Sequence, residues 1–141
     1  MRTTVKRALP LFLLVAILLS LAAPASARAS THFASAGVTV TAKGGGKLQI
    51  EMVARATEKM TSLGVSYVNI KEKQTNGTYR TVKTYTSSTN PSLIQKNRIT
   101  SRALLTYQGK SGKTYQVTVT FRAENDYATA TVLRTSRAIT V

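Results

Sequence analysis

Few side chains in this sequence have the type and spacing needed for acid–base or metal chemistry. The acidic residues are Glu51, Glu58, Glu72, Glu124 and Asp126. Hydrolysis needs two paired carboxylates or a poised histidine, but Glu51 lies on the outward parity of its segment and Glu72 stands between two lysines. Glu124 and Asp126 share a turn, where they would make at best a weak Ca²⁺ site and where turn formation explains them better. With His32 as the only histidine and no cysteine, residue counts exclude a zinc site or a Cys–His nucleophile. We predict no catalytic residue, cofactor or metal.

Three short segments resemble functional motifs, and in each case the local structure explains them better. Residues 44–47 (GGGK) lack the Ser or Thr that a phosphate-binding loop needs after its lysine, and a strand rather than a helix follows. The alternative that this segment is a flexible basic loop in contact with a polyanion is left open. Residues 111–113 (SGK) lie in a turn and lack the helical context of a Ser–Lys nucleophile. Residues 76–78 (NGT) fit a glycosylation sequon, but they also form the turn of a predicted hairpin.

One arrangement of cations and tyrosines could bind an anion. The candidate anion-binding residues are Lys71, Lys73, Tyr79, Arg80, Lys83 and Tyr85. They lie on two adjacent antiparallel segments, and Lys71 and Lys73 share a face because they are two residues apart. Cations would neutralise phosphates while the tyrosine rings pack on sugars or bases. The alternative is a solvated outer face with cross-strand packing. Further cations at Lys110, Lys113, Arg134 and Arg137 lie elsewhere in the chain, so the charge is predicted to be diffuse.

The N-terminus has the three parts of a secretory signal peptide. Arg2, Lys6 and Arg7 precede an uncharged apolar run of 13 residues, 11–23. Pro24 and the small residues 25–27 follow, and we expect cleavage after Ala27. The alternative is a membrane anchor, but this run spans only about 20 Å as a helix against a hydrocarbon core of about 30 Å. We expect a protein that is released, or held non-covalently at the surface, from a Gram-positive bacterium.

The charge of the mature protein indicates the class of its partner. The full chain has a net charge of +15, and loss of residues 1–27 leaves 114 residues with +12. Such a field favours polyanions, including wall polymers, anionic lipid, nucleic acid and acidic proteins. The alternative is a charge that only keeps the protein soluble. One domain is expected at this length, and it must fold without disulfides.

The mature chain alternates apolar and polar residues with the period of β-strands. Residues 28–36 are predicted to be a flexible lead-in and 37–141 a single all-β domain. The predicted strands cover residues 37–42, 48–55, 65–73, 78–85, 99–107, 115–123 and 128–141. The apolar parity shifts between Val65 and Ile70, which predicts a β-bulge. A polar connection is expected over 86–97. About seven strands without a helix favour an antiparallel β-sandwich.

Two segments resemble a fibronectin type III or related immunoglobulin-like domain. Residues 104–119 (LLTYQGKSGKTYQVTV) look like its E–F corner, and residues 64–86 (GVSYVNIKEKQTNGTYRTVKTYT) resemble its C–C′ pair. The resemblance implies that Tyr115 is the structural corner tyrosine, with its hydroxyl bonded to the turn backbone. The chain has no tryptophan for the core, so Ile50 or Met52 would fill that position. A shared fold does not imply a shared function.

The functional prediction is therefore a secreted, non-enzymatic binding domain. Its expected partner is an anionic cell-surface polymer such as cell-wall teichoic acid, or an acidic secreted protein, with nucleic acid less favoured. The alternative is a protein-interaction or adhesion module that binds through a sheet edge or loops.

Overall fold

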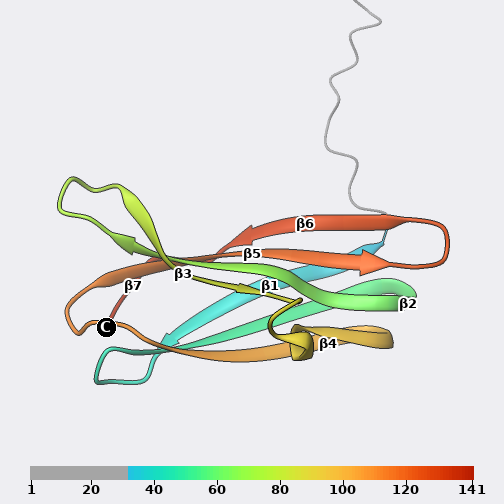
Figure 1. Ribbon diagram of the computed structural model, residues 1–141, viewed down its shortest axis with the longest axis horizontal. Helices are drawn as coiled ribbons and strands as arrows, with labels where there is room; N and C mark the ends of the chain where they lie inside the picture. The colour runs from blue at the N-terminus through green and yellow to red at the C-terminus, as the bar shows by residue number, and fades with distance from the viewer. Residues whose placement is uncertain (1–31) are drawn as a thin grey trace, which may run out of the picture.

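The computed structural model describes residues 32–141, so the predicted signal peptide and the first four residues of the predicted lead-in, 28–31, lie outside the described residues. The elements are β1 (Phe33–Ala42), β2 (Lys47–Lys73), β3 (Tyr79–Thr86), the 3₁₀-helix η1 (Pro91–Leu93), β4 (Ile94–Gln108), β5 (Thr114–Glu124), β6 (Thr129–Thr135) and β7 (Ile139–Thr140). All strand pairs are antiparallel and belong to one seven-stranded sheet that curls on itself (Figure 1). Within residues 32–141, no helix is long and apolar enough to cross a membrane. The all-β prediction is confirmed.

Strand β2 organises the sheet because it forms hydrogen bonds on both of its edges. Its first part pairs with β1 on one edge and β4 on the other. From Ser62 onward β5 takes the place of β1, and β4 continues on the other edge as far as Gly64, beyond which β3 pairs there. Both ends of β2 lie beside the same short turn, since Lys47 pairs with Gln108 and Glu72 pairs with Tyr115. The strand therefore doubles back, as Figure 1 shows. The change of direction coincides with a break in the β4 register between Arg55 and Met60.

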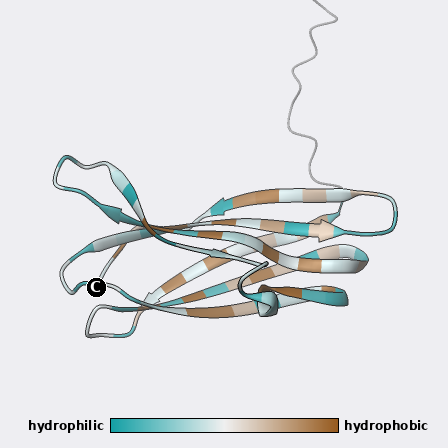
Figure 2. Ribbon diagram, viewed as in Figure 1, coloured by the Kyte–Doolittle hydropathy of each residue, from teal (hydrophilic) through white to brown (hydrophobic). Residues whose placement is uncertain are grey.

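The core lies between the two halves of the curled sheet. Along β5 every second side chain is fully buried, as the alternation predicts: Tyr115, Val117, Val119, Phe121 and Ala123. In β2 the buried parity changes after Val65, and the register with β5 shifts between Val65 and Tyr67. The predicted bulge is confirmed. Each large apolar side chain buried in this way stabilises the fold by about 1.5–3 kcal/mol. Figure 2 shows the apolar residues along the strands and the polar residues in the turns.

Several predicted boundaries differ from the structure. The segments 48–55 and 65–73 are parts of one continuous strand, because β1 pairs with it as far as Ala56 and pairing with β4 and β5 resumes at Met60 and Ser62. The segment 128–141 is two strands, because Ser136 leaves the ladder and accepts the Val117 N–H at its Oγ (2.9 Å). Strand β1 begins at Phe33 rather than Gly37, since Phe33 packs against the core. An immunoglobulin-like sandwich of two separate sheets stays a prediction.

The connection predicted over 86–97 is shorter and more ordered than expected. It contains η1, whose Leu93 is fully buried, and β4 already begins at Ile94. Gly64 of β2 lies directly under this segment. A Cβ at Gly64 would stand 2.1 Å from the Leu93 carbonyl oxygen and 2.9 Å from the Ile94 Cα. The atoms that the added Cβ would meet belong to the backbone of Leu93 and Ile94. No flexible side chain can therefore rotate away to make room for it.

We expect Gly64→Ala to destabilise the protein by about 3 kcal/mol, because the added methyl group must push η1 and β2 apart. Gly37→Ala is the matched control, since a Cβ at Gly37 meets nothing within 4 Å. In a strand this control should be neutral or stabilising by about 0.5–1 kcal/mol. Urea unfolding followed by far-UV circular dichroism measures both. Equal midpoints for the two variants would show that η1 does not seat on β2 as described.

Candidate functional site

The predicted hairpin between β2 and β3 is confirmed. The Gln74 N–H donates to the Thr78 carbonyl (2.7 Å), and the Gly77 N–H donates to the Gln74 carbonyl (3.0 Å). Gly77 has a φ of 84°, a left-handed conformation that glycine adopts without strain. The Asn76 side chain accepts from both the backbone N–H and the hydroxyl of Thr78. The Asn-Gly-Thr segment therefore forms the hairpin turn, and the Asn76 side chain takes part in its hydrogen bonds.

A register shift divides the six candidate anion-binding residues between the two faces of the hairpin. Lys73 pairs with Tyr79 and Lys71 with Thr81, and these pairs lie on the outer face. Arg80 pairs with the buried Glu72, which places it on the inner face. Beyond the shift between Ile70 and Lys71, Lys83 pairs with Ile70 and Tyr85 with Val68, so both also lie on the inner face. The alternation of side chains along β3 does not predict this division, because Val82 is an extra residue without a partner on β2. Beyond Val82, the residues that face inward change from even to odd numbers.

The structure brings two further basic turns beside this hairpin. The Gly109 N–H donates to the Gly46 carbonyl (2.9 Å), and Gln108 Nε2 donates to the Gly45 carbonyl (2.7 Å). A Cβ at Gly46 would stand 2.6 Å from the Gly109 carbonyl oxygen, so the close approach of these turns requires glycine there. The turns at 43–46 and 109–113 therefore meet at the end of the molecule where the hairpin lies.

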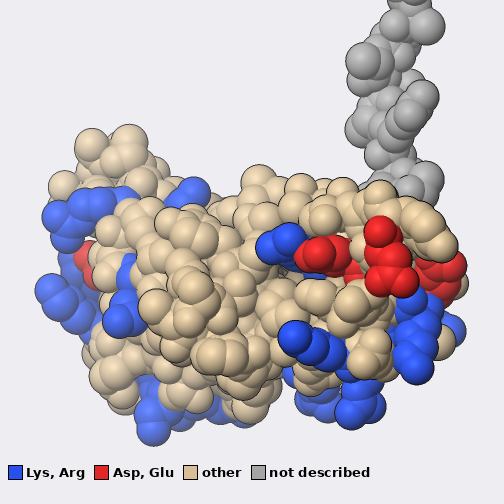
Figure 3. Space-filling view, turned by 45° about the vertical axis from the view of Figure 1, so that its right-hand side comes forward, with Lys and Arg blue, Asp and Glu red and all other residues tan. Residues whose placement is uncertain are grey.

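We call this end the basic loop end, and it is defined by Lys43, Lys47, Lys71, Lys73, Arg80, Lys83, Lys110 and Lys113. Seven of these side chains are exposed and Lys71 is half-buried. In Figure 3 basic atoms lie at this end, on the left of the view, and others lie along the lower side and beside the acidic group on the right. The sequence interpretation placed Lys110 and Lys113 away from the hairpin and treated Lys47 separately. Alternate turns of an antiparallel meander lie at the same end, and this rule could have found the cluster once the fold of β2 was known.

Inside the basic loop end, Glu72 is a buried carboxylate. It is 8% exposed, and the Tyr115 hydroxyl donates to its Oε2 (3.2 Å). The same hydroxyl accepts the backbone N–H of Lys110 (2.8 Å), which is the turn hydrogen bond that the fold resemblance implied. This chain of two hydrogen bonds connects the 109–113 turn to the hairpin. Glu72 was read from the sequence only as a residue between two lysines, although it shares the parity of buried Ile70.

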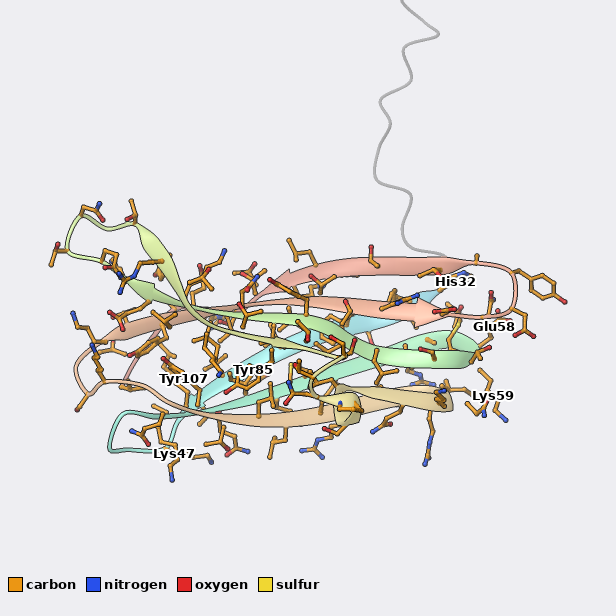
Figure 4. All side chains as sticks on the ribbon, viewed as in Figure 1. His32, Lys47, Glu58, Lys59, Tyr85 and Tyr107 are labelled. Carbon is orange, nitrogen blue, oxygen red and sulfur yellow. The ribbon has the colours of Figure 1, made fainter. Side chains whose placement is uncertain are left out.

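Two tyrosine rings, those of Tyr115 and Tyr107, lie close to this carboxylate on the inner face, and Tyr85 lies near Tyr107. The Tyr107 and Tyr115 rings pack edge to face, with centroids 5.9 Å apart. Lys83 Nζ lies 5.4 Å from the centroid of the Tyr85 ring, within range of a cation–π interaction. Figure 4 shows Tyr85 and Tyr107 near the same end of the sheet, and Lys47 beyond them in the turn. Burial, and then the nearby Glu72 carboxylate and Tyr85, raise the pKa of Tyr107 above its ordinary value.

The remaining acids lie away from the basic loop end. Asn125 Nδ2 donates to Glu58 (3.0 Å), Thr61 donates to Asp126 (3.2 Å), and Glu124 pairs with Arg122 at 2.7 Å. These carboxylates gather at the opposite end of the molecule, the red group in Figure 3. Glu51 forms an ion pair with Arg102 at 2.7 Å on neighbouring strands. Figure 4 places His32 near Glu58, far from Tyr85 and Tyr107.

The basic loop end presents cationic side chains to solvent, and Glu72, the one Asp or Glu side chain there among residues 32–141, is buried. The backbone of Val141 also lies at this end, because its carbonyl accepts from the Gly112 N–H and its N–H donates to the Lys113 carbonyl. Over residues 32–141, no group of three His, Cys, Asp or Glu side chains is arranged to hold a metal ion. Of the two other cations singled out in the sequence, Arg134 donates from Nε to the Ala36 carbonyl (3.1 Å) and Arg137 lies beside β7. Comparisons of the chain with models of known families, with curated proteins and with solved structures found no match.

We expect Tyr115→Phe to destabilise the protein by about 1–3 kcal/mol, because it leaves both the Lys110 N–H and a buried carboxylate oxygen without their partner. Tyr127→Phe is the matched control: Tyr127 is 95% exposed, so its loss should change stability by less than about 0.5 kcal/mol. Guanidinium unfolding measures both variants. Unchanged stability in Tyr115→Phe would contradict a structural role for this hydrogen-bond chain.

We also expect stability to fall at alkaline pH. Burial, as the largest cause, raises the pKa of Tyr107 and Tyr115 above the ordinary value of 10.0. Their contribution is therefore complete below pH 10.0 and is lost as the pH rises through the higher pKa of the folded state. Unfolding midpoints at pH 8 and pH 11, with tyrosinate absorbance as a second signal, measure the loss. Tyr107→Phe should show a smaller loss than the wild type, and an equal loss would contradict this explanation.

Proposed function

We propose that this protein is a secreted, non-enzymatic binding domain that associates electrostatically with an anionic extracellular polymer. Cell-wall teichoic acid, with its phosphate backbone, is the partner we favour. The basic loop end is the proposed contact surface. The predicted signal peptide provides the route to the outside of the cell.

The observation that carries this proposal is the separation of charge along the molecule. Eight Lys and Arg side chains gather at the basic loop end, while the one Asp or Glu side chain there among residues 32–141, Glu72, is buried and hydrogen-bonded to Tyr115. At the opposite end, cations are interspersed with Glu58, Glu124 and Asp126. A cationic surface without exposed acids attracts a polyanion, and the acidic end does not compete for it.

The chemistry of the exposed side chains suits a repeating phosphate polymer. Seven of the eight defining residues are lysines, and six of these are exposed. Lysines act as mobile point charges toward phosphates of varied spacing. Tyr79 is half-buried on the outer face beside Lys73, where its ring can pack on a sugar or polyol. The turns that present Lys43, Lys47, Lys110 and Lys113 are joined by backbone hydrogen bonds, so the cations are held together before binding.

A binding role also agrees with the composition of the inner cluster. It contains one carboxylate and three phenols, and neither a second acid nor a histidine is close to Glu72 among the described residues. General acid–base catalysis of hydrolysis uses a pair of such groups. As part of this proposal, the curled sheet is a variant of the immunoglobulin-like sandwich. The corner geometry of Tyr115 supports that relationship.

We expect the purified protein to be retained on isolated Gram-positive cell walls at low salt and released as the salt concentration rises. Lys110→Gln/Lys113→Gln should elute at lower salt and reduce the slope of log affinity against log salt by about one to two, because two cations no longer displace counterions. Lys96→Gln/Arg98→Gln is the matched control, since it removes two exposed charges from β4 outside the basic loop end.

Two outcomes would contradict the proposal. The first is binding that ignores ionic strength or persists on walls from which the phosphate polymer has been removed. The second is an equal effect of the two double variants, which would mean that total charge rather than the basic loop end determines retention. Circular dichroism of both variants should match the wild type, because all four substituted side chains are exposed.

A further inference from the structure

A groove of about 440 Å³ lies along the free edge of β1, and none of its lining residues belongs to those that define the basic loop end. Its walls are Val38, Thr39 and Val40 of β1, and Arg137, Ala138 and Ile139 of the segment that leads into β7. Strand β1 is at one margin of the curled sheet, and β6 is at the other margin of the path β1-β2-β5-β6. The groove therefore lies where the sheet does not close.

The edge of β1 presents unpaired backbone groups to this groove. The Ala36 carbonyl accepts from Arg134 Nε (3.1 Å), so the backbone of Ala36 faces away from β2. In an antiparallel pair every second residue has this orientation, which assigns it also to Val38 and Val40. Within residues 32–141, no backbone hydrogen bond outside the β1–β2 ladder involves either residue. Such an edge is a template for one more strand.

The opposite wall is open because β6 and β7 are separated there. The Ser136 N–H donates to the Val117 carbonyl, and its hydroxyl donates to the Arg137 carbonyl. These bonds draw residues 136–137 toward β5. The side chains of Val38, Val40 and Ile139 are partly buried against the core, so the floor of the groove is apolar. An extended segment placed there would pack every second side chain on this floor.

The positive charge at the groove indicates the charge of the extended segment that would bind there. Arg137 lines it, Arg134 reaches across the sheet margin to Ala36, and none of the lining residues is acidic. Arg137 is exposed, and no carboxylate of residues 32–141 lies within ion-pair distance of it. A second copy of this chain would bring the same two arginines against each other, whereas an acidic segment would pair with them.

We propose that this groove binds an extended acidic segment of another polypeptide, which adds as a strand to the free edge of β1. Backbone hydrogen bonds to Val38 and Val40 supply sequence-independent affinity. Alternating apolar side chains pack on the floor, and acidic side chains pair with Arg134 and Arg137. This proposal does not rest on polyanion binding at the basic loop end. An experiment can therefore contradict either proposal and leave the other standing.

The test uses the isotope-labelled protein and a capped seven-residue peptide of alternating glutamate and valine. In the free protein, the Val38 and Val40 amides should exchange with solvent much faster than those of Thr39 and Thr41, which face β2. Saturating peptide should slow exchange at Val38 and Val40 by about tenfold or more. Arg137→Glu should weaken peptide affinity by about tenfold. Arg98→Glu, the matched control on β4, should change it less than about twofold.

Two further peptides separate the parts of the proposal. The same peptide with every amide N-methylated should not bind, because it cannot donate to the β1 edge. The same peptide with lysine in place of glutamate should bind much more weakly. Equal binding of either one overturns the proposal. So does protection of Val38 and Val40 that grows with protein concentration in the absence of peptide, because a second copy would then occupy the edge.

Discussion

Strand β2 forms hydrogen bonds to a neighbour on each edge along most of its length, and the rest of the molecule is arranged around this constraint. Four other strands pair with it directly, β1 and β4 along its first part and β3 and β5 along its second. An extended chain of 27 residues would be too long for a small domain. Its change of direction beyond Arg55 converts that length into two facing layers with a core between them. Gly64 then allows η1 to seat against the second layer.

The doubling back of β2 also determines where charge accumulates. Because β2 begins and ends at the same end of the sheet, the turns that precede and follow it meet there, together with the 109–113 turn. Each turn carries lysines that are unremarkable in sequence, and only their convergence makes a strong local field. The hydrogen bonds from the Lys110 N–H through Tyr115 to Glu72 hold two of these turns together. Through Tyr115, the buried Glu72 carboxylate helps to hold the turn that carries Lys110 and Lys113. Because Glu72 is buried, it forms no ion pair with these exposed lysines.

The curl leaves the sheet open, and its margins differ in character. At the inner face beside β3, Tyr107 and Tyr115 lie beside Glu72, and Lys83 lies over the ring of Tyr85. At the margin beside β1, the backbone itself is exposed over an apolar floor, and a hydrogen bond from Arg134 to the Ala36 carbonyl crosses the gap. Binding at the two regions would depend on different interactions. Electrostatic attraction, which salt screens, would dominate at the first, and directional backbone hydrogen bonds would dominate at the second.

The sequence alone determined the features that depend on local periodicity and turn chemistry. Alternation in 115–123 gave the buried face of β5, the Asn-Gly pair gave the β2–β3 hairpin, and the change of parity after Val65 gave the bulge. It also indicated a basic, cysteine-free, all-β protein. Tertiary structure alone decided that 48–55 and 65–73 are one strand, since a ladder is sustained by partners distant in the chain. It likewise decided that Val82 moves Lys83 and Tyr85 to the inner face, that Glu72 is buried, and that Lys43, Lys47, Lys110 and Lys113 join the hairpin. Proximity between turns follows from how strands pair and curl, and no local pattern records that pairing.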